Sequence, residues 1–156
     1  MKRHVVIAFV YAVAAMACGV FYREFTKFSD FTGVTALGKV HTHLFMLGMV
    51  VFLLVALFDA KLSLRQSKLY KPFVIVYNIG VPLASVMMLV RGVLQVAGVT
   101  VSAGADGAVA GISGVGHVVT AAGIVLFFVM LLGALKEKKA ERSDAGAAEN
   151  GEETGE

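Results

Sequence analysis

Four long apolar stretches, separated by short polar or glycine-rich connections, dominate the pattern of this chain. They cover residues 5–22, 36–58, 73–98 and 111–135. Charged side chains are almost absent from them, since the second contains only Lys39 and the third only Arg91. About 20 helical residues cross the roughly 30 Å apolar core of a bilayer, and runs of this length without two-residue alternation are typical of helices. The pattern predicts an all-α membrane protein, a four-transmembrane-helix bundle formed by residues 1–135.

The composition fits a small integral membrane protein. The chain has 156 residues, of which 58% are hydrophobic, whereas soluble domains are nearer half apolar. Its single cysteine excludes an intramolecular disulfide, and it has no basic patch interleaved with aromatic residues of the kind that binds nucleic acid. Residues 136–156 are charged and contain Gly and Ala but no large apolar residue. We expect them to form a disordered cytoplasmic tail.

Lysine and arginine are shared unequally between the two ends of the predicted bundle, and this inequality predicts its orientation. One end, with both termini and the connection after the second stretch, carries Lys2, Arg3, Lys61, Arg65, Lys68, Lys71, Lys136, Lys138, Lys139 and Arg142. The first connection and the start of the second stretch carry Arg23, Lys27 and Lys39. We expect both termini in the cytoplasm and the protein in the bacterial plasma membrane. Residues 15–17 resemble a signal-peptide cleavage site only poorly, so we expect the first helix to remain uncleaved.

A short segment after the first stretch has aromatic residues at helical spacing. Phe21, Phe25, Phe28 and Phe31 recur among charged side chains. This pattern predicts a short amphipathic helix lying in the outer membrane interface, although a simple aromatic belt would have the same composition.

Polar side chains gather in the predicted outer half of all four helices. Polar groups inside a membrane are costly and are candidates for function. Those at this depth are Cys18, Tyr22, His41, His43, Arg91, Gln95 and His117.

The rotation of a regular helix, about 100° per residue, suggests which of these side chains meet. His41 shares a face with Gly48 on the second helix, and His117 shares a face with Gly114 on the fourth. Both faces mix small, polar and aromatic residues, so we expect the two imidazoles to face each other inside the bundle. His43 should point in nearly the opposite direction, toward a neighbouring helix or a second subunit of a homo-oligomer.

Two histidines from separate helices are a common axial ligand set for haem. The leading hypothesis is therefore a b-type haem bound by His41 and His117 in the outer half of the bundle, with Gly48 and Gly114 leaving room for the flat ring. Such a protein would serve electron transfer, haem sensing or haem handling, with a redox partner or quinone that the sequence does not identify. No nucleophile–base pair or phosphate-binding loop is evident, which favours a role other than that of an enzyme.

The anionic propionates of a haem would need donors at the same depth. The guanidinium of Arg91 is suited to carboxylates, and Gln95 and Tyr22 could share this role.

Two other interpretations remain open. One is a site without haem: either zinc or copper bound by His41, His117 and Cys18, or a site for proton movement or transport. The other is structural, with the histidines as interhelical hydrogen-bond partners and Arg91 paired with Glu24 or Asp106.

Several short motifs carry a resemblance to a known family. They are Tyr22-Arg23-Glu24-Phe25-Thr26-Lys27, Lys39-Val40-His41-Thr42-His43-Leu44, Leu47-Gly48-Met49 and Gly114-Val115-Gly116-His117. In these motifs the chain resembles an uncharacterised family of small four-helix bacterial membrane proteins, known only as a domain of unknown function, over all four helices but not the tail. The His-Thr-His motif followed by Leu-Gly is also similar to helix openings in haem–copper oxidase relatives, including the NnrS membrane proteins. That second resemblance implies haem or copper binding by His41, His43 and His117; without the other histidines of an oxidase it does not imply oxygen reduction or proton pumping.

Overall fold

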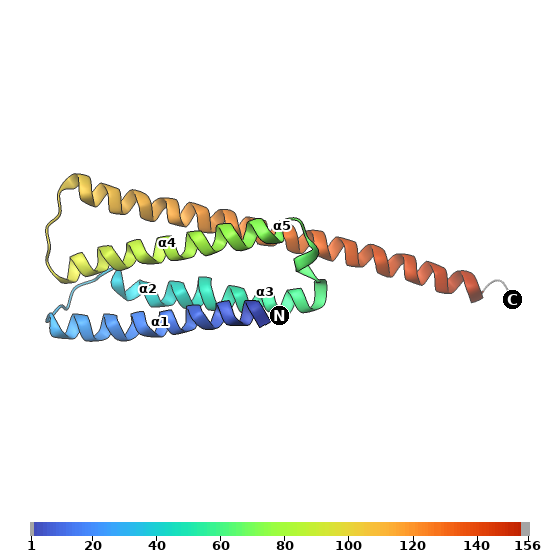
Figure 1. The fold of residues 1–156 in the computed structure, drawn as a ribbon, viewed down its shortest axis with the longest axis horizontal. Coiled ribbons are helices and arrows are strands. Elements are labelled where there is room, and N and C mark those ends of the chain that lie inside the picture. The colour runs from blue at the N-terminus through green and yellow to red at the C-terminus, as the bar shows by residue number, and fades with distance from the viewer. Residues whose placement is uncertain (1, 154–156) are drawn as a thin grey trace.

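The computed structural model describes residues 2–153, with side chains over residues 2–143, and every regular element in this part of the chain is helical. The elements are α1 (Lys2–Phe28), α2 (Leu37–His43), a π-helical segment (Leu44–Val50), α3 (Val51–Leu62), a 3₁₀ turn (Leu64–Gln66), α4 (Tyr70–Val96) and α5 (Ala103–Glu153). The helices run back and forth as an elongated bundle, and α5 continues well beyond it (Figure 1).

Four helical spans are long and apolar enough to cross a membrane: Lys2–Phe28, Leu37–Leu62, Tyr70–Val96 and Ala103–Ser143. The second comprises α2, the π-helical segment and α3, which follow one another without a break. The four apolar stretches thus correspond to four helices, and the predicted fold class is confirmed.

The two ends of the bundle differ in what they contain. At one end, the connection end, residues 29–36 join α1 to α2 and residues 97–102 join α4 to α5 (Figure 1). At the other, the terminal end, α1 begins, residues 63–69 join α3 to α4, and α5 leaves the bundle (Figure 1).

Contacts between the helices are uneven. α1 packs along α2, the π-helical segment and α3, while α4 packs against α2 on one side and extensively against α5 on the other. α1 and α4 make almost no direct backbone contact. The second span therefore lies between α1 and the α4–α5 pair.

Small residues bring α4 and α5 close together. A Cβ at Gly80 would lie 2.5 Å from the backbone nitrogen of Thr120, and one at Gly116 would lie 2.6 Å from that of Ala84. Apolar burial cannot drive helices together inside lipid, so such close backbone packing is what holds membrane helices in contact.

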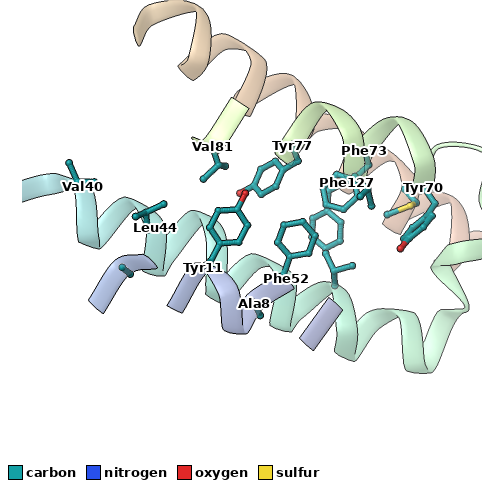
Figure 2. Packing of buried hydrophobic residues seen from close by; sticks show 14 of the residues in the cluster. Ala8, Tyr11, Val40, Leu44, Phe52, Tyr70, Phe73, Tyr77, Val81 and Phe127 are labelled. Carbon is teal, nitrogen blue, oxygen red and sulfur yellow. The ribbon is translucent and has the colours of Figure 1, made fainter. Parts of the chain in front are cut away.

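An aromatic cluster fills the bundle toward the terminal end (Figure 2). Phe52 of α3 stacks on Tyr11 of α1, with ring centroids 5.9 Å apart, and meets Tyr77 of α4 edge-on at the same separation. Phe73 of α4 in turn stacks on Phe127 of α5. These rings connect all four spans and fix their mutual rotation.

Two segments differ from the expectation. The aromatic residues after the first stretch do not form a separate interfacial helix, because α1 continues to Phe28, whose side chain is 82% exposed. Residues 136–153, expected to be disordered, continue α5 as helix to Glu153, and the rest of the expected tail, 154–156, lies outside the described residues. Ala, Glu, Lys and Arg are strong helix formers, so the composition of this segment is compatible with continued helix.

Candidate functional site

The imidazoles of His43 and His117 meet at the connection end of the bundle. His43 is the last residue of α2, and His117 lies on α5. Their ring centroids are 6.1 Å apart and their planes are nearly perpendicular, at 82°. The structure thus brings His43, rather than His41, beside His117, which corrects the expected pairing.

The buried stripe of α2 explains this outcome. Leu37, Val40 and Leu44 are buried, and they face the interior at helical spacing. His41 and His43 flank this stripe on opposite sides, and α2 lies between α1 and α4. His41 therefore turns toward α1, and His43 turns toward α4 and α5.

The expected pairing failed because the sequence does not tell which helix lies beside the His41 side of the second span. His41 and Gly48 do share that side, as expected from helical spacing. His41 packs over Gly19 of α1, and a Cβ at Gly48 would meet the Tyr11 ring of α1. The shared side therefore faces α1 and not the His117 side of α5.

Both histidines are held in the same tautomer by a carbonyl one turn earlier. His43 Nδ1 lies 2.9 Å from the carbonyl oxygen of Lys39, and His117 Nδ1 lies 2.7 Å from that of Ser113. A carbonyl oxygen only accepts, so Nδ1 carries the proton in each ring. The Nε2 lone pair of each neutral imidazole is consequently left for another partner, the arrangement found in metal-binding histidines.

A cavity of about 490 Å³ lies beside the two rings. Three spans and the first connection contribute to it, and its lining residues are Val34, Thr35, Ala36, Lys39, His43, Met88, Arg91, Gln95, Ser113 and His117. Lys39 and Arg91 give the lining two positive charges, and no carboxylate is among the lining residues. Its volume is within the range of small-molecule sites, and its charge favours an anionic group.

Arg91 and Gln95 also have structural partners. Arg91 Nη2 lies 3.3 Å from a carboxylate oxygen of Asp106, and the two side chains are 42% and 54% exposed. This is one of the pairings expected under the structural interpretation. Gln95 Oε1 accepts a 2.8 Å hydrogen bond from the backbone N–H of Ala36 and lies 3.1 Å from the Thr35 hydroxyl, so it anchors the start of α2 against α4.

His41 belongs to a separate environment on the α1 side. Its ring stacks on Tyr22, with centroids 6.4 Å apart and an interplanar angle of 15°. It also packs closely over Gly19. Among the described residues its buried Nδ1 has no hydrogen-bond partner. Tyr22, expected to reach an anionic group, therefore accompanies His41 and does not line the cavity.

The two glycines expected to make room for a flat ring lie elsewhere. The Tyr11 ring occupies the space beside Gly48, where a Cβ would come within 2.3 Å of it. Gly114 is exposed, and a Cβ there would have no described atom within 4 Å. Neither glycine lines the cavity.

A buried polar cluster at the terminal end was missed in the sequence. His4 is 0% exposed, its Nε2 lies 2.7 Å from the Tyr70 hydroxyl, and its Nδ1 lies 3.7 Å from a carboxylate oxygen of Asp59. Arg65 Nε lies 2.8 Å from the same Asp59 oxygen. His4 had the appearance of part of a basic N-terminus, although its position seven residues before Tyr11 places both on one helix face.

No group of three or more His, Cys, Asp or Glu residues that could hold a metal occurs among the described residues. Any metal at the paired histidines would therefore take its other ligands from a porphyrin, a thioether or a small molecule. Cys18 lines a different cavity, between α1 and α4.

The fold defines the general class of this chain, a small four-helix protein of the membrane type. Residues 1–134 match the family model described as protein of unknown function (DUF2871), and the chain belongs to that family. No curated protein and no solved structure matches it. The local similarity to NnrS and haem–copper oxidase relatives stays a prediction.

Proposed function

We propose that this protein is a haem-binding membrane protein in which His43 and His117 are the axial ligands of a b-type haem. The observation that carries the proposal is the pair of adjacent imidazoles beside one cavity. Each has Nδ1 bonded to a backbone carbonyl and Nε2 without a hydrogen-bond partner among the described residues. A carbonyl partner of this kind orients an imidazole and increases its basicity as a ligand.

The spacing of the rings is compatible with one metal between them. Bonds from a metal to imidazole nitrogen are about 2 Å long, so two imidazoles holding one metal from opposite sides would have their nitrogens roughly 4 Å apart. A centroid separation of 6.1 Å would let both rings reach one metal if each turned its Nε2 toward the other. Bound haem supplies one-electron chemistry, whose potential depends on its axial ligands and surroundings.

Lys39 and Arg91 support the binding of the two propionates. Both line the cavity beside the histidines. Arg91 also pairs with Asp106. An ion pair this exposed contributes little to stability, so the guanidinium can turn to a carboxylate of the ligand at small cost. Propionates would also explain why two cations line a cavity at a membrane surface.

The orientation of the protein is part of the proposal. The excess of Lys and Arg at the terminal end supports cytoplasmic termini in a bacterial plasma membrane. The histidine pair then lies near the outer surface, and the protein serves electron transfer, haem sensing or haem handling there.

A second candidate function is copper binding without a porphyrin. Met88 of α4 lines the same cavity as His43 and His117. Two imidazoles and a thioether are ligands that suit copper in its reduced state. Zinc is less favoured, because structural zinc sites take four protein ligands.

Titration of haemin into the detergent-purified protein tests the proposal. We expect a shifted Soret band that saturates at one haem per chain, and no saturable shift for His117→Ala. Val118→Ala is the matched control, because Val118 is the next residue of α5 and its side chain is 70% exposed. A wild-type protein that binds copper stoichiometrically but no haem supports the second candidate, and one that binds neither contradicts both.

A further inference from the structure

An apolar groove runs between α1 and α4, whose backbones make almost no direct contact. Its volume is about 490 Å³. The lining residues include Ala14 and Cys18 of α1, Val40 and Leu44 of the second span, and Pro82 and Leu89 of α4. Aliphatic side chains form nearly all of this surface, so the groove suits an apolar chain.

The groove opens on the outer surface of the bundle. Val6 and Val10 on the α1 side and Val86 on the α4 side line it and are 52%, 60% and 48% exposed. In a bilayer these residues face lipid, so a molecule dissolved in the membrane can enter the groove from the side.

Polar residues line this apolar groove along two turns of α4, and one of them has a hydroxyl without a partner among the described residues. The hydroxyl oxygen of Ser85 is buried and has no hydrogen-bond partner among the described residues. The residue is 4% exposed and lines the groove. Pro82 has no N–H to donate to the carbonyl of Asn78, four residues earlier. The side-chain oxygen of Asn78 accepts a 3.1 Å hydrogen bond from Tyr11, and both residues line the groove as well.

These polar groups lie deep in the membrane, which restricts the occupant. Ser85 is near the middle of α4 (Tyr70–Val96). An acyl chain has no polar atom at that depth, and a headgroup would have to leave the interface to reach it. A polar group without a partner is costly inside lipid, so an occupant that offers a hydrogen-bond acceptor at this depth is favoured.

We propose that the groove between α1 and α4 binds a lipid-soluble quinone. Its ring carbonyl accepts a hydrogen bond from the Ser85 hydroxyl, and its apolar tail follows the aliphatic walls. A quinone is apolar enough to enter the middle of a bilayer and still carries carbonyl oxygens. This proposal does not depend on haem, because the groove and the cavity beside His43 and His117 have no lining residue in common.

Binding of a short-tailed benzoquinone to the full-length protein in phosphatidylcholine nanodiscs tests the proposal. We expect saturable binding at one quinone per chain, above the partition into empty nanodiscs. Ser85→Ala should weaken it about five- to tenfold, the effect of one lost hydrogen bond. Ala14→Phe should abolish it by filling the groove, whereas Ala17→Phe, on an exposed position three residues further along α1, should leave it unchanged.

The outcomes separate the possible occupants. Quinone uptake no greater than in empty nanodiscs overturns the proposal, as does a phospholipid that co-purifies in the groove and that quinone does not displace. Equal affinity of the wild type and Ser85→Ala also overturns it. The Ser85 variant changes little volume, so this comparison remains decisive even if Ala14→Phe fails to fold.

Discussion

The hydroxyl of Tyr77 on α4 donates a 2.9 Å hydrogen bond to the carbonyl of Leu47, inside the π-helical segment of the second span. This bond fixes α4 to the one stretch where the second span departs from α-helical geometry. The segment begins directly after His43, so the same bond helps to set the rotation at which His43 meets His117.

Replacement of Tyr77 by Phe tests the role of this bond. Loss of one hydrogen bond should lower the free energy of unfolding by about 0.5–1.5 kcal/mol. Amide hydrogen exchange in residues 44–50 should accelerate more than in α1, because the π-helical segment loses its hydrogen bond to α4. An unchanged exchange pattern would show that the segment is stable without Tyr77.

Close packing of α4 and α5 predicts that a larger side chain destabilises the fold at one glycine of α5 and not at another. Gly116→Val should destabilise the fold by roughly 1–3 kcal/mol, the usual cost of overpacking, since its Cβ would lie 2.6 Å from the backbone of Ala84. Gly114→Val, two residues away, is the control, because a Cβ there meets no described atom within 4 Å. The midpoint of thermal unfolding in detergent measures both, and equal losses would contradict the observed packing.

The buried histidine at the terminal end predicts a coupling between two helices. His4 Nε2 and the Tyr70 hydroxyl are 2.7 Å apart, with His4 fully buried. In a double-mutant cycle with His4→Leu and Tyr70→Phe we expect a coupling of about 1 kcal/mol in the free energy of unfolding, as for partners in one hydrogen bond. Strictly additive losses would mean that the contact contributes nothing.

Cysteine labelling in intact cells tests the proposed orientation. In a Cys18→Ser background, the Asp106→Cys variant, altered near the connection end, should react with a membrane-impermeant maleimide. The Ser63→Cys variant, altered in the connection at the terminal end, should react only after the cells are lysed. Both positions are exposed, so the reverse pattern would place the termini outside.

The sequence was sufficient to predict the helices because the membrane imposes a simple rule on length and polarity. Each apolar stretch became one span, and the polar side chains near the connection end were recognised as a group. The depth of a side chain in the membrane follows from the number of residues between it and the end of its helix. A small error in where the helix begins changes that depth little.

Rotation was harder to predict, because it depends on neighbours that the pattern does not name. His41 and Gly48 share one side of the second span, as expected, but the sequence does not show that this side faces α1. The gap between α1 and α4 could not be foreseen either, since it depends on which spans are neighbours. His4 was overlooked because three polar or charged residues beside a terminus resemble a solvent-exposed end.

The visible spectrum of protein from haem-supplied cells, compared between His43→Ala and His41→Ala, tests the central claim most directly. We predict that the wild type and His41→Ala share the spectrum of a six-coordinate, low-spin haem, because His41 lies against Tyr22 on the α1 side. His43→Ala should lose that spectrum. A haem spectrum that survives His43→Ala and disappears in His41→Ala would contradict the assignment of His43 and His117 as the ligand pair.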